Sequence, residues 1–345
     1  MKVLFSRVAV LGLGLLGGSV AAAVRARGVA GHVVGYGRRR APLERARALG
    51  FVDSVVDGDE GAARAVRDAD LVILATPVSS MASVLEAAAP GLSQGVLVTD
   101  VGSVKAPLAE CLPRCLPAGA VYVGSHPMAG SHETGVEHAR DDLLEGACCV
   151  VTPRAGADAV ACQRLVAFWR ALGGVVVCRD PRVHDAEVAW VSHLPHVLAF
   201  AYARALEAAP ASAGELAGSG FRDFVRIARS DSELWGDILG LNHQALAGPL
   251  RAFSQALAEL AGAIEADDAD GVAARERILA AAARRLDSIS PANSLASGHE
   301  GAQTGARPRP AGADEDCYCA RSGGENPEIQ AAPRAAATRS IDRNS

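Results

Sequence analysis

The sequence predicts an α/β fold in which an N-terminal Rossmann-type domain with a parallel sheet is followed by an all-helical domain. Short apolar runs alternate with alanine-rich helical segments as far as residue 180, a pattern typical of stacked βαβ units. A glycine-rich turn follows the first apolar run, and strand signals end near residue 178. We therefore place a dinucleotide-binding domain at residues 1–180, a helical domain at 181–290 and a disordered tail at 291–345.

Short apolar runs mark the expected strands of the N-terminal domain. Several are apolar throughout, as strands covered by helices on both faces should be. The helical segments between them supply the crossovers that parallel strands require. The expected strands are residues 8–11, 32–36, 71–75, 96–100, 121–124, 148–152 and 175–178.

Beyond these strands the pattern is helical. Asp180 and Pro181 suit the N-cap and the first position of a helix. Apolar residues recur every three or four positions from Leu250 to Ile264, so this stripe must face the rest of the fold or another subunit. The tail is rich in Gly, Pro, Ala, Ser and charge, and its Cys317 and Cys319 lack the second pair that a zinc site needs.

The composition excludes several classes of function. The chain has 345 residues, 50% of them hydrophobic, and can bury cores in two domains. Its formal net charge of -5 comes from both signs spread along the sequence, so we expect no nucleic-acid partner. Glycines interrupt the apolar stretch from Val8 before it could span a membrane. The eight cysteines are scattered, which indicates reduced thiols and a cytoplasmic location.

The turn that begins at Gly12 has the spacing of a dinucleotide-binding fingerprint. Gly12 permits the tight turn, Gly14 lets the backbone approach the pyrophosphate, and Gly17 allows close packing of helix on strand. The helix N-terminus faces the negative charge of the pyrophosphate. We expect Leu15 in this turn, and Thr76 after a later strand, to contact the same cofactor. A merely structural turn is the alternative.

The end of the second strand bears on which nicotinamide cofactor binds. An acidic side chain there accepts hydrogen bonds from a ribose 2′-hydroxyl, whereas arginine suits a 2′-phosphate. The sequence continues Gly37-Arg38-Arg39-Arg40, with no carboxylate in the turn. We therefore expect Arg38 to contact NADP, with NAD as the alternative cofactor and a solvated arginine cluster as the structural alternative.

Polar clusters occur where an open sheet places its ligand, outside the carboxyl ends of its strands, and again in the helical part. They lie at residues 100–105, 125–135, 192–196 and 221–228. In these clusters the sequence resembles the prephenate/arogenate dehydrogenase family over roughly residues 7 to 290. The resemblance implies a Rossmann-type domain, a helical substrate and dimerisation domain that builds a homodimer, and a site in the cleft between them.

The resemblance also implies roles for individual residues. His126 would hydrogen-bond the hydroxyl of the substrate ring, and Ser103 would be its orienting partner near the nicotinamide. Arg226 would anchor the ring carboxylate, and His196 would line the substrate pocket. Neutral imidazole suits the acceptance of a hydroxyl proton near pH 7, and loss of the carboxylate as carbon dioxide then aromatises the ring.

Each of these residues also has a purely structural interpretation. His126 could cap the end of a strand, Ser103 could be a helix N-cap, and His196 could be a core histidine satisfied by backbone, as could His193. Arg226 could pair with Asp223 on a solvated helix face.

Lys105 is expected at the surface or at a helix end and is not assigned to the site. One departure from the family concerns the motif after Gly130. Ser or Thr and then Glu commonly follow there, whereas this chain has Ser131 and His132, with Glu133 displaced by one position. Ser131 and His132 are expected to contact the substrate. Because prephenate carries a keto group where arogenate carries an ammonium, the missing carboxylate favours prephenate, with arogenate as the alternative.

Other classes fit the sequence less well. A metal-dependent hydrolase would need a motif such as H-E-x-x-H, and a serine hydrolase a G-x-S-x-G elbow; neither occurs. A β-hydroxyacid dehydrogenase normally uses a lysine in its helical part, and residues 180–286 contain none. A non-catalytic dinucleotide-binding regulator would not need a histidine, a serine and an arginine around the cleft.

Overall fold

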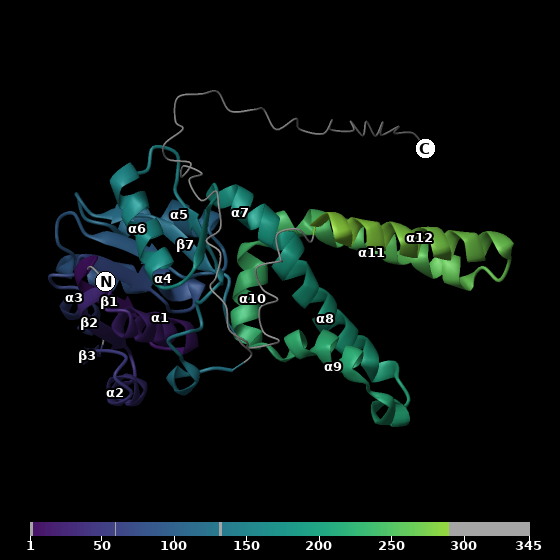
Figure 1. The fold of residues 1–345 in the computed structure, drawn as a ribbon, viewed down its shortest axis with the longest axis horizontal. Helices are drawn as coiled ribbons and strands as arrows, with labels where there is room; N and C mark the ends of the chain where they lie inside the picture. The colour runs from purple at the N-terminus through teal and green to yellow at the C-terminus, as the bar shows by residue number, and fades with distance from the viewer. Residues whose placement is uncertain (1–2, 59, 131–132, 290–345) are drawn as a thin grey trace, which may run out of the picture.

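The computed structural model describes residues 3–58, 60–130 and 133–289. The predicted disordered tail and its two cysteines lie outside these residues. Within them, a sheet domain and an elongated group of helices follow each other along the chain (Figure 1). Helix α7 (Pro181–Val188) lies at the junction of the two parts.

Six parallel strands form the main sheet in the order β3-β2-β1-β4-β5-β6. The direction of strand order reverses between β1 and β4, and the carboxyl ends beside such a switch point are where open α/β sheets bind ligands. The parallel Rossmann-type sheet predicted from the sequence is therefore confirmed. The strands are β1 (Phe5–Leu11), β2 (Ala30–Gly37), β3 (Ser54–Asp57), β4 (Leu71–Leu74), β5 (Leu97–Asp100) and β6 (Val121–Tyr122).

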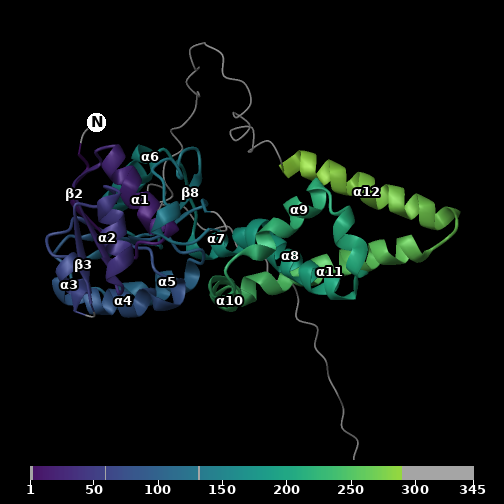
Figure 2. The same ribbon diagram turned by 90° about the horizontal axis from the view of Figure 1, so that it is seen from below.

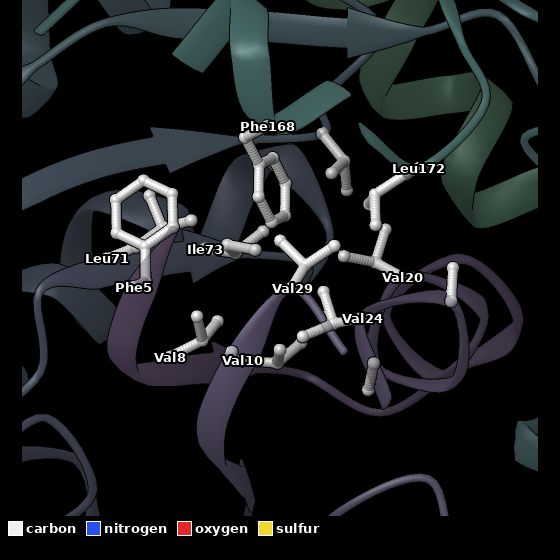
Figure 3. Close-up of a cluster of buried hydrophobic side chains, with 14 of the residues drawn as sticks. Phe5, Val8, Val10, Val20, Val24, Val29, Leu71, Ile73, Phe168 and Leu172 are labelled. Atoms are coloured by element: carbon white, nitrogen blue, oxygen red, sulfur yellow. The ribbon is translucent and has the colours of Figure 1, made fainter. Parts of the chain in front are cut away.

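Two hydrophobic cores lie on the two faces of this sheet. Successive residues of a strand point to opposite faces, so Val8 and Val10 enter one core while Ala9 and Leu11 enter the other. Figure 3 shows the first core, in which Phe168 packs above the central strands. Burial on both faces explains why these strands are apolar throughout.

Helices cover both faces of the main sheet (Figure 2). The first core includes side chains of α1, α2 and α6, and the second includes side chains of α3, α4 and α5. The helices are α1 (Leu15–Ala26), α2 (Arg40–Ala48), α3 (Gly61–Ala65), α4 (Met81–Ala88), α5 (Ala106–Cys111) and α6 (Ala159–Ala171).

The last strands of the domain form a second sheet that the sequence analysis did not separate from the first. Strand β8 (Cys148–Thr152) pairs antiparallel with β7 (Gly124–Pro127) and parallel with β9 (Val175–Cys178). The predicted run at residues 121–124 is divided between the two sheets, because the chain passes from β6 to β7 at Val123. After this break, His126 of β7 contacts His184 of α7.

The helical part begins as predicted, with Asp180 as the N-cap of α7. The Asp180 carboxylate accepts hydrogen bonds from the backbone N–H of Arg182 and Val183. A π-helical turn, Ala189–His193, separates α7 from α8 and interrupts the regular α-helical hydrogen bonding there. The remaining helices are α8 (Leu194–Ala205), α9 (Ser219–Arg226), α10 (Ser232–Leu241), α11 (His243–Glu265) and α12 (Ala269–Ile289).

Helices α11 and α12 lie side by side as a long arm that extends away from the sheet domain in both views (Figures 1 and 2). The predicted apolar stripe has two environments. Leu250 and Phe253 pack against a core formed with α8, whereas Leu257 and Ile264 are exposed. No helix in the described part of the chain is long and apolar enough to cross a membrane.

Candidate active site

The glycine turn after β1 has the geometry of a pyrophosphate cradle. Gly12 has a φ of +106°, and a Cβ there would lie 2.6 Å from the Ala75 carbonyl oxygen. A Cβ on Gly17 would lie 2.0 Å from the Gly12 oxygen, so glycine is required for the close helix-strand approach. A Cβ on Gly14 would meet no heavy atom within 4 Å, which leaves open space in front of the backbone. This arrangement suits a bound diphosphate.

Two adjoining cavities extend from this turn. The first, of about 620 Å³, lies between the glycine turn and the β2–α2 loop. The second, of about 920 Å³, continues between the sheet domain and α10. Gly14, Arg38 and Thr76 line both, and Leu15 lines the second. The structure therefore brings five of the six residues predicted for the cofactor to one cleft, and the sixth, Gly17, packs directly behind Gly12.

Thr76 gives independent support for a ligand in this cleft. Its hydroxyl oxygen is buried and has no hydrogen-bond partner within the described residues. A buried hydroxyl without a partner is costly, so a polar group of a bound molecule would satisfy it. Together with the open space at Gly14, this shows that the residues present fit a dinucleotide.

The three arginines after β2 have different surroundings. Arg38 and Arg39 line the first cavity. Arg40 turns toward acidic groups instead, because its guanidinium pairs with Glu44 and lies 3.3 Å from an Asp57 carboxylate oxygen. Asp57 is in β3, a strand that the sequence analysis did not predict. Arg38 and Arg39 form no ion pair with the described residues, so two guanidinium groups remain on the cleft side of the turn.

His126 is in β7 and is buried, with 7% of its surface exposed. Its Nδ1 lies 2.9 Å from Nε2 of His184, whose own Nδ1 lies 2.8 Å from an Asp185 carboxylate oxygen. Burial, and then the positive potential of His184 and Lys105, lowers the pKa of His126 well below its usual value of 6.5. The imidazole is therefore neutral near pH 7, as a proton acceptor must be.

Asp185 connects the histidine pair to the loop that contains Ser103. Its two carboxylate oxygens accept hydrogen bonds from the backbone N–H of Lys105, at 2.7 Å, and of Ala106, at 2.8 Å. Ser103 itself lines the larger cavity. Because α7 holds both Asp185 and His184, one helix fixes the Ser103 loop and the His126 ring relative to each other.

A buried ion pair lies beneath the same loop. The Lys105 ammonium donates to an Asp100 carboxylate oxygen and, at 2.7 Å, to the carbonyl oxygen of Ser125. Tyr122 donates to the other Asp100 oxygen at 2.8 Å. Burial lowers the pKa of Lys105. Lys105 is at a helix end, as expected, but the expectation of a surface position is wrong, because the side chain is needed to neutralise buried Asp100.

His193 and His196 have different environments on the π-turn and α8. Nδ1 of His193 accepts a hydrogen bond from the Asn242 amide at 2.9 Å, and burial lowers its pKa to about 4. His193 is thus a core histidine, although its Nε2 has no partner within the described residues. His196 instead stacks on Trp235, with ring centroids 3.7 Å apart, and Trp235 lines the larger cavity.

The remaining predicted substrate residues are less closely placed. Arg226 is exposed at the end of α9 and does not line either cavity described above. The pKa of His196 is lowered mainly by burial, and the charge of Arg226 lowers it further. It forms no ion pair with Asp223 within the described part of the chain. Ser131 and His132 lie outside the described residues, while their neighbours Gly130 and Glu133 line the larger cavity.

The sequence analysis missed His184, Asp185 and the contact between Ser79 and Asp237. His184 and Asp185 follow a helix N-cap, and nothing in the neighbouring sequence indicates that His184 contacts His126, a strand residue 58 positions earlier. The helical part predicted around Asp180 does place the pair on the first turns of a helix. Only the tertiary fold shows that this helix packs against β7 and the Ser103 loop.

Comparisons with known proteins agree with this geometry. Residues 20–178 match the family model for the prephenate dehydrogenase nucleotide-binding domain, and residues 180–276 match the model for the prephenate dehydrogenase dimerization domain. Cyclohexadienyl dehydrogenase of Zymomonas mobilis is 34% identical over 270 residues, which cover 77% of this chain and 91% of that protein. Prephenate dehydrogenase of Bacillus subtilis is 31% identical, covering 76% and 71%.

Solved structures show the same relationship. The fold matches prephenate dehydrogenase of Aquifex aeolicus in complex with hydroxyphenyl propionate and NAD+, with a TM-score of 0.75 and 30% identity, over 82% of this chain and 98% of that one. It also matches Synechocystis arogenate dehydrogenase, with a TM-score of 0.68 and 30% identity, over 82% and 99%.

Proposed function

The chain belongs to the prephenate dehydrogenase family of oxidoreductases, and from this we infer that it oxidises and decarboxylates prephenate to 4-hydroxyphenylpyruvate in tyrosine biosynthesis. The observation that carries the inference is the buried His126, whose imidazole is neutral near pH 7. It does not itself line either cavity, but its hydrogen bonds lead through His184 and Asp185 to the Ser103 loop, and Ser103 lines the larger cavity. A non-catalytic regulator would not need this imidazole or the two residues hydrogen-bonded behind it.

The chemistry assigns a task to each part of the cleft. A bound nicotinamide cofactor supplies the acceptor for the two electrons that leave the carbinol carbon. His126 accepts the hydroxyl proton, since imidazole with a lowered pKa stays unprotonated near neutrality. Ser103 lines the larger cavity and orients the same hydroxyl. Loss of carbon dioxide follows because it aromatises the ring, so positioning matters more than a further acid or base.

Substrate carboxylates need cationic or polar partners. Arg226 is the proposed anchor for the ring carboxylate, and His196 is proposed to reach the pocket beside Trp235. Because Arg226 is exposed in the isolated chain, contact with substrate would require a change in the position of α9 or of its side chain. Ser131 and His132 are proposed to contact the side chain of the substrate, since Gly130 and Glu133 on either side line the cavity.

Prephenate is the proposed substrate and arogenate the alternative. Residue 132, directly after Ser131, is a histidine where the family commonly has a glutamate. The carboxylate that could pair with the arogenate ammonium is therefore one position later, at Glu133. The Glu133 carboxylate lies 3.4 Å from Nδ1 of His138, so the protein itself already offers it a partner other than the substrate. Both observations favour a keto substrate.

The chain binds a nicotinamide dinucleotide, and we propose NADP as the preferred form. Arg38 and Arg39 line the first cavity near the end of β2, and Arg40 is engaged by Glu44 and Asp57. A 2′-phosphate would gain charge-assisted bonds from the first two guanidinium groups. NAD is the alternative.

A homodimer through the helical part is also proposed. Leu257 and Ile264 on α11, and Leu279 and Leu286 on α12, are exposed apolar side chains on an arm that extends from the rest of the fold. Exposed apolar surface of this kind is typical of an interface, and the family model for these residues is a dimerization domain. Location in the cytoplasm stays a prediction.

Steady-state rates with prephenate or arogenate, each paired with NAD or NADP, test the proposal. The expected result is an increase in absorbance of the reduced cofactor, fastest with prephenate and NADP. No reduction with either substrate would overturn the proposed activity, and a higher kcat/KM for arogenate would overturn the proposed substrate. Sedimentation at several concentrations tests the dimer separately.

A further inference from the structure

Two side chains behind His126 have no assigned task. His184 and Asp185 are adjacent on α7, with 1% and 3% of their surfaces exposed. His126, His184 and Asp185 form a continuous row of hydrogen bonds, from Nδ1 of His126 to Nε2 of His184 and from Nδ1 of His184 to the carboxylate. Burial excludes solvent from these bonds, so Nδ1 of His126 and both ring nitrogens of His184 have defined partners.

The partners determine which nitrogens hold protons. A carboxylate that already accepts two backbone N–H groups acts only as an acceptor, so Nδ1 of His184 must donate to Asp185. With a single proton on the His184 ring, held at Nδ1, its Nε2 offers only a lone pair, and Nδ1 of His126 donates to it. The remaining nitrogen of His126, Nε2, is left unprotonated. That atom is the one able to accept a proton from a ligand.

We propose that His184 and Asp185 are positioning residues that hold His126 in the tautomer whose Nε2 accepts the substrate hydroxyl proton. This inference rests on the proposed function. During the reaction the hydroxyl O–H bond breaks and its proton joins Nε2 of His126, the C–O bond becomes a carbonyl, and the carbinol hydrogen would leave with its two electrons as hydride to a bound nicotinamide. When carbon dioxide leaves, the electron pair of the broken C–C bond aromatises the ring, and the ring oxygen takes the proton back from Nε2. The proton on Nδ1 stays in its hydrogen bond to His184, whose far nitrogen is bonded to the Asp185 anion.

The other charged groups near His126 disfavour a positive charge on its ring, so the link through His184 to the Asp185 anion has a role in the reaction. After burial, a charge on His184 would oppose a positive charge on His126 most, followed by the Lys105 ammonium, itself paired with Asp100, and then by His193. Tyr122, hydrogen-bonded to Asp100, is kept neutral because burial raises its pKa. Asp185 is therefore the anion that the hydrogen bonds of His126 reach, through His184. It favours the imidazolium that forms when the proton arrives, and it does so without contacting substrate.

Two substitutions at position 184 separate this role from a structural one. In His184→Gln, the side-chain oxygen can reach the position of Nε2 and accept from His126, but the link to Asp185 is lost. In His184→Asn, the shorter amide can donate to Asp185 from the position of Nδ1, but it cannot reach His126. If His184 positions His126, glutamine is the better replacement. If His184 only holds the Asp185 carboxylate in place against the Ser103 loop, asparagine is the better replacement.

The expected result is that His184→Asn lowers kcat by ~10²-fold or more with KM for cofactor near wild type, while His184→Gln loses ~10-fold or less. Thermal midpoints and cofactor binding of both variants are measured to show that each is folded. Loss of kcat in the glutamine variant that equals or exceeds the loss in the asparagine variant would overturn the proposal. Equal, small losses in both would do the same.

A second measurement does not depend on turnover. Nitrogen-15 chemical shifts of histidine side chains distinguish the two tautomers, and the His126 signals are identified by their absence from His126→Asn. Wild type is expected to show the proton on Nδ1 of His126, and His184→Asn a mixture. A proton on Nε2 in wild type would refute the proposed positioning role even if prephenate is oxidised. If the tautomer is as expected but no substrate is oxidised, the proposed function fails instead.

Discussion

Ser79 donates a hydrogen bond from its hydroxyl to a carboxylate oxygen of Asp237, joining the sheet domain to α10 across the cleft. Both residues line the larger cavity, together with Thr76 on one side and Trp235 on the other. The contact therefore bridges the two walls of the larger cavity. The two residues are 158 positions apart in the sequence, so their contact depends on how the sheet domain and α10 are placed relative to each other.

We predict that Ser79→Ala raises KM for prephenate by ~3- to 10-fold while the thermal midpoint changes little. The lost bond is exposed, so its net contribution to stability should be at most about 1 kcal/mol, but the geometry of the cleft depends on it. Steady-state kinetics and thermal unfolding of the same samples check this. Ser254→Ala is a matched control, because the Ser254 hydroxyl donates to a backbone carbonyl within its own helix, α11, and lines neither cavity. A fall in thermal midpoint with unchanged KM would contradict the prediction.

His126→Asn is expected to lower kcat by ~10²-fold or more with cofactor affinity near wild type, because the proton acceptor alone is removed. The pKa of His126 is lowered, so the wild-type enzyme should keep its neutral imidazole below pH 6.5. The log of kcat/KM should thus fall on the acid side with a single protonation, and its midpoint should lie below 6.5. Retention of wild-type kcat in the variant would eliminate the assignment.

Acid should destabilise the fold through His193. Its pKa is about 4 in the folded chain against 6.5 for an ordinary histidine, so between these values the unfolded chain binds more protons. Stability is then complete above about pH 6.5 and is lost as the pH falls toward 4, by up to ~3 kcal/mol from this group. Denaturant unfolding at several pH values measures the loss. His193→Gln should show a shallower dependence on pH, and an identical slope would exclude His193 as the cause.

The sequence alone predicts those features of the fold that depend on residues close together in the chain. The glycine turn, the strands of the main sheet and the Asp180 N-cap depend on neighbouring residues, and the structure contains them. Strand β3 was missed because Ser54–Asp57 is four residues long and only half-buried, so it lacks the apolar run of a central strand. These are local patterns, read correctly where they are long and apolar.

The candidate site depends on contacts that no local pattern contains. Periodicity cannot show that Lys105 turns inward to Asp100, or that α7 brings Asp185 onto the Ser103 loop 80 positions earlier. It also cannot show that Arg40 is neutralised by Glu44 and a β3 residue. The family resemblance identified His126 and Ser103 as candidate site residues. The hydrogen bonds that position them are seen only in the folded structure.

Arg226→Ala should raise KM for prephenate by an amount equivalent to ~2 to 4 kcal/mol, because a charge-assisted pair with the ring carboxylate is lost. Cofactor binding should barely change. Arg222→Ala is a suitable control, since Arg222 is on the same helix and donates to the carbonyl oxygen of Ala217. Normal substrate binding combined with unfolding at a lower temperature would instead identify Arg226 as a structural residue.

The cofactor preference should depend on Arg38 and not on Arg40. Arg38 lines both cavities, so a 2′-phosphate there should gain ~1 to 3 kcal/mol, or roughly 5- to 150-fold in affinity. Replacing Gly37 with Asp and Arg38 with Ser should reverse the preference to NAD, because a carboxylate then faces the ribose hydroxyl. Arg40→Ser is the matched control: its guanidinium already pairs with Glu44 and Asp57, so its loss should change the ratio by less than ~3-fold. The measurement is kcat/KM for NADP and for NAD at saturating prephenate. A clear preference of the wild-type enzyme for NAD would contradict this prediction and would mean that Arg38 and Arg39 do not bind the 2′-phosphate.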